Sequence, residues 1–204
     1  MVNFAEELAY WYLRLNGFFL LQNFVLHRSR EGEQSSREGE QKGTADSDLL
    51  AIRFPHVYEE IGGKEQDWDR GRFSSWGMEI DKDNLAFIIE VKSGSNVSKN
   101  DMKDAFSRER LRKAIYRFGI FPKSRVPSIT AKLQNEKQIK VDSWLVAKLA
   151  VTEEGVAGPW LNLLLYEADQ FIQNRISLSS KYRDRVYFPN ALIQYLAWKQ
   201  FRLC

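Results

Sequence analysis

The sequence predicts a mixed α/β fold in which helices flank a sheet, and three observations support this. Apolar residues recur at helical spacing near the amino terminus, several short segments are rich in β-branched and aromatic residues, and helical periodicity returns near the carboxyl end. The 204 residues, 44% of them hydrophobic, suffice for one buried core. We therefore expect a single domain over 1–204, with its core at about 3–166 and a C-terminal helical part at about 167–204.

The first expected elements are a helix and a strand. The apolar residues at helical spacing are Phe4, Leu8, Trp11 and Leu15. Gly17 follows where a helix C-terminal cap belongs, so the sequence predicts a helix over about 3–16. Residues 18–27 are rich in aromatic and aliphatic side chains and predict a strand.

A polar stretch at 28–43 follows this strand. It consists almost wholly of charged residues, Ser, Gln and Gly, and it repeats Arg-Glu-Gly-Glu-Gln at 30–34 and 37–41. Such a composition cannot bury a core. We expect an exposed loop, and a short tandem duplication accounts for the repeat better than a function does.

The middle of the chain supplies most of the expected sheet. Residues 48–54 and 85–92 predict two strands, and the Leu-Ala-Phe-Ile-Ile run of the second is apolar enough for burial on both faces. Residues 55–84 are mixed in character and predict an irregular insertion. The later elements are expected to be a helix at about 99–118, strands at 141–151 and 160–166, and helices at about 168–176 and 189–202, the last opening with a proline.

Composition excludes several classes of protein. The single cysteine, Cys204, rules out an intrachain disulfide and a multi-cysteine zinc site. His27 and His56 are the only histidines, too few for a zinc site built on histidines. Gly62-Gly63-Lys64 lacks the remainder of a phosphate-binding loop. No stretch reads as a membrane span or a signal peptide, so we expect a soluble, cytoplasmic protein without membrane association.

The chemistry begins at the end of the buried strand. Ionised side chains are costly to desolvate, so a buried strand that ends in Glu90-Val91-Lys92 is expected to have partners there. Because side chains alternate along a strand, Glu90 and Lys92 share one face, about 7 Å apart at a rise of about 3.3 Å per residue. The alternative is a strand that emerges into solvent, with these residues forming an ordinary surface pair.

A carboxylate and an amine on one face suit phosphodiester hydrolysis. The carboxylate can bind a hard divalent cation, Mg²⁺ or Mn²⁺, and the lysine can orient a water or offset charge on the phosphate. A lone carboxylate binds Mg²⁺ poorly, so a second acid is needed. Asp48 is the leading candidate, with the backbone carbonyl of Val91 as a further metal ligand. Asp46 is an additional acid that could bind a second metal or cap the loop, and the capping role is favoured.

These residues resemble the PD-(D/E)xK nuclease superfamily, in particular its branch of Holliday junction resolvases and Mrr-like restriction endonucleases. The resemblance covers about residues 3–120. It lies in Ala5-Glu6-Glu7-Leu8-Ala9, in Leu13 and Gly17, in Asp48-Leu49-Leu50-Ala51, and in Phe87-Ile88-Ile89-Glu90-Val91-Lys92-Ser93-Gly94. It implies a restriction-endonuclease-like α-β-β-β-α-β core, here with added C-terminal helices.

The resemblance also implies roles for individual residues. Asp48 aligns with the metal-binding aspartate, Glu90 with the second acid and Lys92 with the catalytic lysine. A glutamate of the first helix joins the site in similar proteins; the family spacing favours Glu6 over Glu7, and the alternative is that both are ordinary helix N-terminal acids. The motif's proline is replaced by Ser47, a departure that leaves the metal chemistry intact.

The segment after the catalytic strand is basic. Its candidate nucleic-acid-binding residues are Lys99, Lys103, Arg108 and Arg112. Such a surface can neutralise phosphates without reading sequence, although a solvated helix that carries acids among its bases is an equal alternative. The net charge of +3 requires that any affinity for nucleic acid come from a local patch of this kind.

The sequence thus predicts a Mg²⁺- or Mn²⁺-dependent endonuclease that acts on DNA in repair, recombination or defence. The first alternative is a catalytically inactive module of the same fold that binds nucleic acid, and the second is a structural or partner-binding protein. RNA as the substrate and a homodimer both remain open at this level.

Overall fold

The computed structural model describes residues 3–25, 46–59, 61, 63–94, 96–178 and 190–202. The predicted polar loop at 28–43 lies outside the described residues, as do His27 and the predicted helix-opening Pro189.

A six-stranded mixed sheet forms the centre of the described fold. Its strands are β1 (Phe19–Val25), β2 (Asp46–Arg53), β3 (Asn84–Lys92), β4 (Gln138–Val141), β5 (Trp144–Thr152) and β6 (Leu161–Leu164). They are ordered β1-β2-β3-β5-β4, and β6 also pairs with β5. The β1–β2, β2–β3 and β4–β5 pairs are antiparallel, whereas β3–β5 and β5–β6 are parallel. The predicted mixed α/β class is confirmed.

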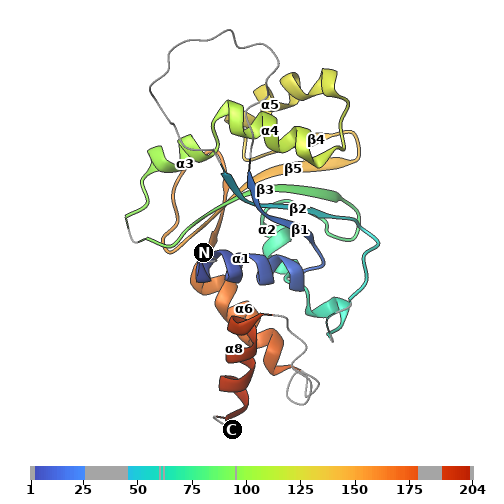
Figure 1. Ribbon diagram of the computed structural model, residues 1–204. Coiled ribbons are helices and arrows are strands. Elements are labelled where there is room, and N and C mark those ends of the chain that lie inside the picture. The colour runs from blue at the N-terminus through green and yellow to red at the C-terminus, as the bar shows by residue number, and fades with distance from the viewer. Residues whose placement is uncertain are drawn as a thin grey trace.

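Helices cover both faces of this sheet. They are α1 (Phe4–Leu15), α2 (Arg70–Ser75), α3 (Lys99–Ala105), α4 (Arg108–Phe118), α5 (Val126–Asn135), α6 (Leu165–Ser177) and α8 (Ala191–Arg202). Figure 1 shows α1, α6 and α8 below the sheet and α4 and α5 above it. The alternation of β3 explains the two layers, because Phe87 and Ile89 pack with α1 and α6 while Ala86 and Ile88 pack with α4 and α5.

Helix α1 begins and ends as its sequence predicts. The Asn3 side chain accepts a hydrogen bond from the backbone of Ala5 at the start. After the helix, Gly17 has a φ of +80°, which glycine adopts without strain. A Cβ at this position would also lie 3.0 Å from a methyl carbon of Val57. Gly17 therefore both turns the chain and lets Val57 approach the end of the helix.

Two of the predicted elements are each divided in two. The helix expected at 99–118 breaks at Phe106, which is buried against Trp160, and Ser107 has an extended conformation before α4. The strand expected at 141–151 includes a tight turn, in which Asp142 has a φ of +54° and joins β4 to β5. The hydrophobic pattern alone shows neither break, because the first lies in a segment that is rich in charged residues, and the second is marked only by the short polar pair Asp142-Ser143.

Other boundaries and elements also differ from the predictions. The strand expected at 160–166 ends at Leu164, and α6 follows at once. Helix α5 and the 3-10 turn before it (Lys123–Arg125) were not predicted. The start of α8 is capped by Asn190, whose side chain accepts hydrogen bonds from two backbone N–H groups, whereas the prediction placed a proline at the start of this helix.

The described residues of the 55–84 insertion are more ordered than predicted. It contains a 3-10 turn (Glu65–Asp67) and helix α2. An ion pair ties it to α6, because the buried Arg175 guanidinium lies 2.5 Å from a carboxylate oxygen of Glu59. The other oxygen of Glu59 accepts the backbone N–H of Ile61 at 2.7 Å. These buried contacts hold the insertion against the helical layer that contains α1.

A buried lysine lies on the opposite face. Lys148 of β5 is 1% exposed, and its ammonium donates to the carbonyl of Gln134 in the last turn of α5 at 2.8 Å. A cation at this end of a helix interacts favourably with the helix dipole. Burial nevertheless lowers the pKa of Lys148 to about 8.

Candidate active site

The carboxyl end of β3 holds a buried carboxylate between two cations. The Glu90 side chain is 4% exposed; Lys92 Nζ lies 2.7 Å from its Oε1 atom and Arg110 Nη2 lies 3.2 Å from its Oε2 atom. The Glu90–Lys92 contact follows from the predicted alternation along the strand. Glu90 does not belong to a surface pair, because its side chain is almost inaccessible to solvent.

Asp48 lies next to this group on the neighbouring strand. The last antiparallel pair of β2 and β3 joins Leu49 to Ile89, so the next position in the same register places Asp48 opposite Glu90. Side chains directly opposite in antiparallel strands have Cβ atoms about 5 Å apart. Asp48 Oδ2 also accepts the backbone N–H of Val91 at 2.7 Å, which fixes the carboxylate at the end of the sheet.

Helix α1 contributes a third carboxylate. Glu6 lines the same hollow as Asp48 and Glu90. Glu7 instead accepts a hydrogen bond from the side chain of Asn190 at the start of α8. Of the two glutamates left open by the sequence, the structure places Glu6 at the candidate site.

These side chains surround one open hollow of about 770 Å³. It is lined by Asn3, Glu6, Asp48, Glu90, Val91, Lys92, Ser93, Gly94, Asn96, Val97, Asp101, Asp104, Ala105 and Arg110. Five of these residues carry carboxylates and two carry cationic groups, so the lining is negative. All four predicted catalytic residues, and the predicted metal ligand Val91, therefore lie in one place.

Burial and the Asp48 carboxylate raise the proton affinity of Glu90 and Glu6. Burial raises the pKa of Glu90, and the neighbouring Asp48 raises it further against the effect of Arg110 and Lys92. The pKa of Glu6 is raised by the same two causes, burial first and then Asp48. Burial opposes the charge of Lys92, but Glu90 outweighs that effect and raises the lysine's pKa. Clustered carboxylates of this kind favour a bound cation that neutralises them.

The donor set has the chemistry that Mg²⁺ or Mn²⁺ requires, namely carboxylate oxygens and a nearby backbone carbonyl. The side chains are not yet arranged as ligands. Within the described residues, no three His, Cys, Asp or Glu side chains form a group that could hold a metal ion. Both oxygens of Glu90 face cationic side chains. The residues thus fit a hard divalent cation in kind, and binding would require a local rearrangement.

The predicted nucleic-acid-binding residues lie outside the hollow. Lys99 and Lys103 of α3 and Arg108 and Arg112 of α4 are exposed, and none of them lines the hollow. The part of α3 that reaches the hollow is acidic, with Asp101 and Asp104.

Arg110 is the residue that sequence reasoning missed as part of the site. It was one basic residue among several in a basic segment. Its position in the helix distinguishes it from most of the others. It lies one residue before Leu111 and four before Ala114, and because both of these are buried, Arg110 lies at the edge of the apolar side of α4.

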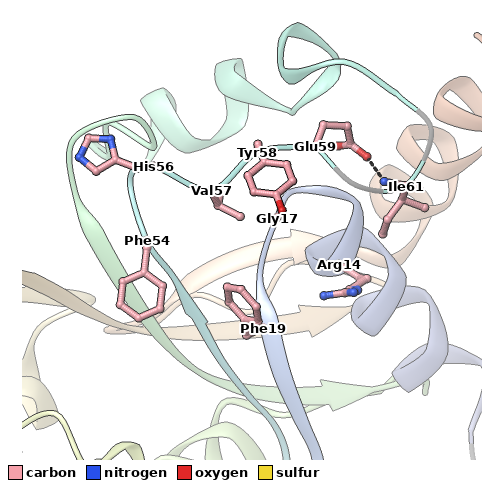
Figure 2. Close-up of a pocket in the computed structure, with 9 residues that line it drawn as sticks. All are labelled: Arg14, Gly17, Phe19, Phe54, His56, Val57, Tyr58, Glu59 and Ile61. Carbon is pink, nitrogen blue, oxygen red and sulfur yellow. Dashed lines mark hydrogen bonds between the residues drawn. The ribbon is translucent and has the colours of Figure 1, made fainter.

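A second cavity, of about 340 Å³, has a different character. Figure 2 shows Phe19, Phe54 and Tyr58 around it, together with Arg14. Glu59 is the only carboxylate among the residues that line it, and this side chain is paired with Arg175. His56 also lies there, away from the candidate site. This cavity therefore lacks the set of acids that the predicted chemistry needs.

Comparison with known proteins gives no relative. No family model matches the chain, and no curated protein and no solved structure matches it. Among the helices in the described parts of the chain, none is long and apolar enough to cross a membrane.

Proposed function

We propose that this chain hydrolyses phosphodiester bonds of DNA with the help of Mg²⁺ or Mn²⁺, as a PD-(D/E)xK-like endonuclease. The observation that carries the proposal is the convergence of Glu6, Asp48, Glu90 and Lys92 on one negative hollow. These residues come from three separate elements, α1, β2 and β3. If Glu90 and Lys92 were only an ordinary surface pair, there would be no reason for Glu6 and Asp48 to lie beside them.

The order of elements supports the same proposal. Helix α1, the antiparallel strands β1, β2 and β3, helix α4 and the parallel strand β5 follow the α-β-β-β-α-β order expected of a restriction-endonuclease-like core. Helices α2, α3 and α5 and strands β4 and β6 would then be additions to that core.

Asp48 and Glu90 would hold the cation, and the backbone carbonyl of Val91 would be the third ligand from the protein. The N–H of Val91 points to Asp48, and in an extended strand the N–H and C=O of one residue lie on the same edge, so this carbonyl also faces Asp48. When bound, the cation would supply Lewis-acid stabilisation of the phosphate and lower the pKa of a coordinated water.

The chain's own residues would do the remaining work. Lys92 is 39% exposed and is held at Glu90, so its ammonium can meet a phosphate oxygen or orient the attacking water. Glu6, which lines the same hollow, would accept a hydrogen bond from that water.

Plasmid cleavage tests the proposal. Purified protein is incubated with plasmid DNA and Mg²⁺ or Mn²⁺, beside the variants Asp48→Ala and Lys92→Ala. Lys132→Ala is a matched control, because Lys132 is exposed on α5 and does not line the hollow. We expect the parent and the control to cleave, and the two site variants to lose activity on the order of 10²-fold or more.

Two other outcomes identify the alternatives. Binding of DNA without cleavage would favour an inactive nucleic-acid-binding module. Neither binding nor cleavage would contradict the proposal and favour a partner-binding role. Equal cleavage by parent and Lys92→Ala would assign the activity to a contaminant or to another site.

A further inference from the structure

Arg110 is one of the two cationic residues that contact the buried acid of the candidate site. Its guanidinium lies 3.2 Å from Glu90 Oε2, while Lys92 lies 2.7 Å from Oε1. The Arg110 side chain is 22% exposed and that of Glu90 is 4% exposed. Arg110 also lines the hollow. A cation that enters from the hollow therefore meets a Glu90 carboxylate whose two oxygens already face positive charge.

Glu90 would bind a cation more readily if one of the two contacts yielded, because like charges at one carboxylate repel each other. The Arg110 contact is the longer of the two, and hydrogen bonds weaken as they lengthen. The two cations also come from different elements. Lys92 belongs to the same strand as Glu90, whereas Arg110 reaches Glu90 from α4.

We infer that Arg110 is an internal counter-ion that holds the place of the divalent cation at Glu90, leaves Glu90 when the cation binds, and then contacts a phosphate of the substrate. This inference rests on the proposed function and adds a positioning residue to it. A guanidinium suits both roles, because its planar donors match a carboxylate and a phosphate equally well.

The inference makes DNA binding and cation binding depend on each other through Arg110. Without the cation, Arg110 is engaged by Glu90 and adds little to DNA affinity. With the cation, Arg110 becomes available to phosphate. Linkage requires that the cation raise DNA affinity by the same factor by which DNA raises cation affinity, and loss of Arg110 should reduce that factor.

The test compares parent, Arg110→Gln and the matched control Lys132→Gln, which also removes one positive charge. Mn²⁺ affinity is measured by calorimetry without DNA. Affinity for a short duplex is measured with and without Ca²⁺, an oxygen-seeking cation used in place of Mg²⁺. We expect Arg110→Gln to bind Mn²⁺ about tenfold more tightly than the parent, and to lose DNA affinity only when Ca²⁺ is present. Lys132→Gln should match the parent in Mn²⁺ affinity.

Each other outcome overturns the inference. Unchanged or weaker Mn²⁺ binding by Arg110→Gln would show that Arg110 does not compete with the cation. An equal loss of DNA affinity with and without Ca²⁺ would show that Arg110 contributes only a positive charge to DNA binding, independently of the cation. If the parent still binds Mn²⁺ and cleaves DNA when either of these two results is obtained, the inference about Arg110 fails and the proposed function stands. If neither protein binds Mn²⁺, both fail.

A second variant, Arg110→Lys, keeps the inference testable if Arg110→Gln does not fold. Arg110→Lys keeps the charge but loses the fork of donors. We expect its Mn²⁺ affinity to exceed that of the parent by a smaller factor than Arg110→Gln would give. An affinity below that of the parent would contradict the inference.

Discussion

Removal of the Asp48 charge should stabilise the protein while it abolishes the proposed activity. Asp48 lies opposite Glu90 in the register, and its carboxylate raises the pKa of both Glu90 and Glu6. If the two charges are as far apart as opposite Cβ atoms, about 5 Å, they repel each other by about 3 kcal/mol at an effective dielectric constant of about 20. Loss of the attraction between Asp48 and Lys92 offsets part of this gain. We therefore expect Asp48→Asn to raise the free energy of unfolding by about 1–2 kcal/mol.

The assay is thermal unfolding in the presence of a chelator. For a domain of this size, about 1–2 kcal/mol corresponds to an increase in Tm of about 2–8 °C. The amide oxygen of the variant can still accept the N–H of Val91, so the backbone contact is retained. The control is Glu153→Gln, an exposed acid, which should change stability by less than about 0.5 kcal/mol.

Addition of Mg²⁺ should reverse the order of stability. A ligand that binds only the folded state raises its stability, so the parent should gain and Asp48→Asn should gain much less. A Tm of Asp48→Asn at or below that of the parent without metal would refute the reasoning, because it would mean that the clustered carboxylates do not repel one another.

Three further predictions concern the rest of the fold. From pH 8 to 10 the free energy of unfolding of the parent should rise. The pKa of the buried Lys148 is about 8 in the folded state and about 10.5 in the unfolded state, so the unfolded chain holds more protons in this range. Chemical denaturation of Lys148→Met should show no such rise. Gly63→Ala should cost about 2–4 kcal/mol, because the added Cβ would overlap the guanidinium of Arg175 and disturb its buried ion pair; an unchanged urea midpoint would contradict this. Substitution of Arg108 and Arg112 together by Ala should weaken DNA retention and lower the slope of log affinity against log salt by about 2, and unchanged retention would remove these residues from the interface.

Much of the candidate site was accessible from the sequence because it follows from local geometry. The alternation of a buried strand places Glu90 and Lys92 on one face, and the strand that starts near Asp48 offers the second acid. What the sequence did not contain is the register between β2 and β3, which sets Asp48 opposite Glu90. Strand register depends on the packing of whole faces and on turn geometry, and the turn here lies in a long connection.

The missing parts share a physical cause, which is that tertiary contacts decide them. The feature that makes Arg110 part of the site is its contact with Glu90, which lies 20 residues earlier in the chain. The break at Phe106 depends on packing against Trp160, which comes from a distant part of the chain. The turn at Asp142 is marked in the sequence only by the short polar pair Asp142-Ser143, and it is the antiparallel pairing of β4 with β5 that makes this pair a turn. Local propensity cannot report contacts of this kind.

The most direct test of the central claim is anomalous diffraction from a crystal soaked with Mn²⁺. We expect one strong peak within about 2.1 Å of carboxylate oxygens from both Asp48 and Glu90. The same peak should disappear in Asp48→Asn. A peak bound elsewhere, or none beside these two acids at millimolar Mn²⁺, would contradict the claim that they form a metal site.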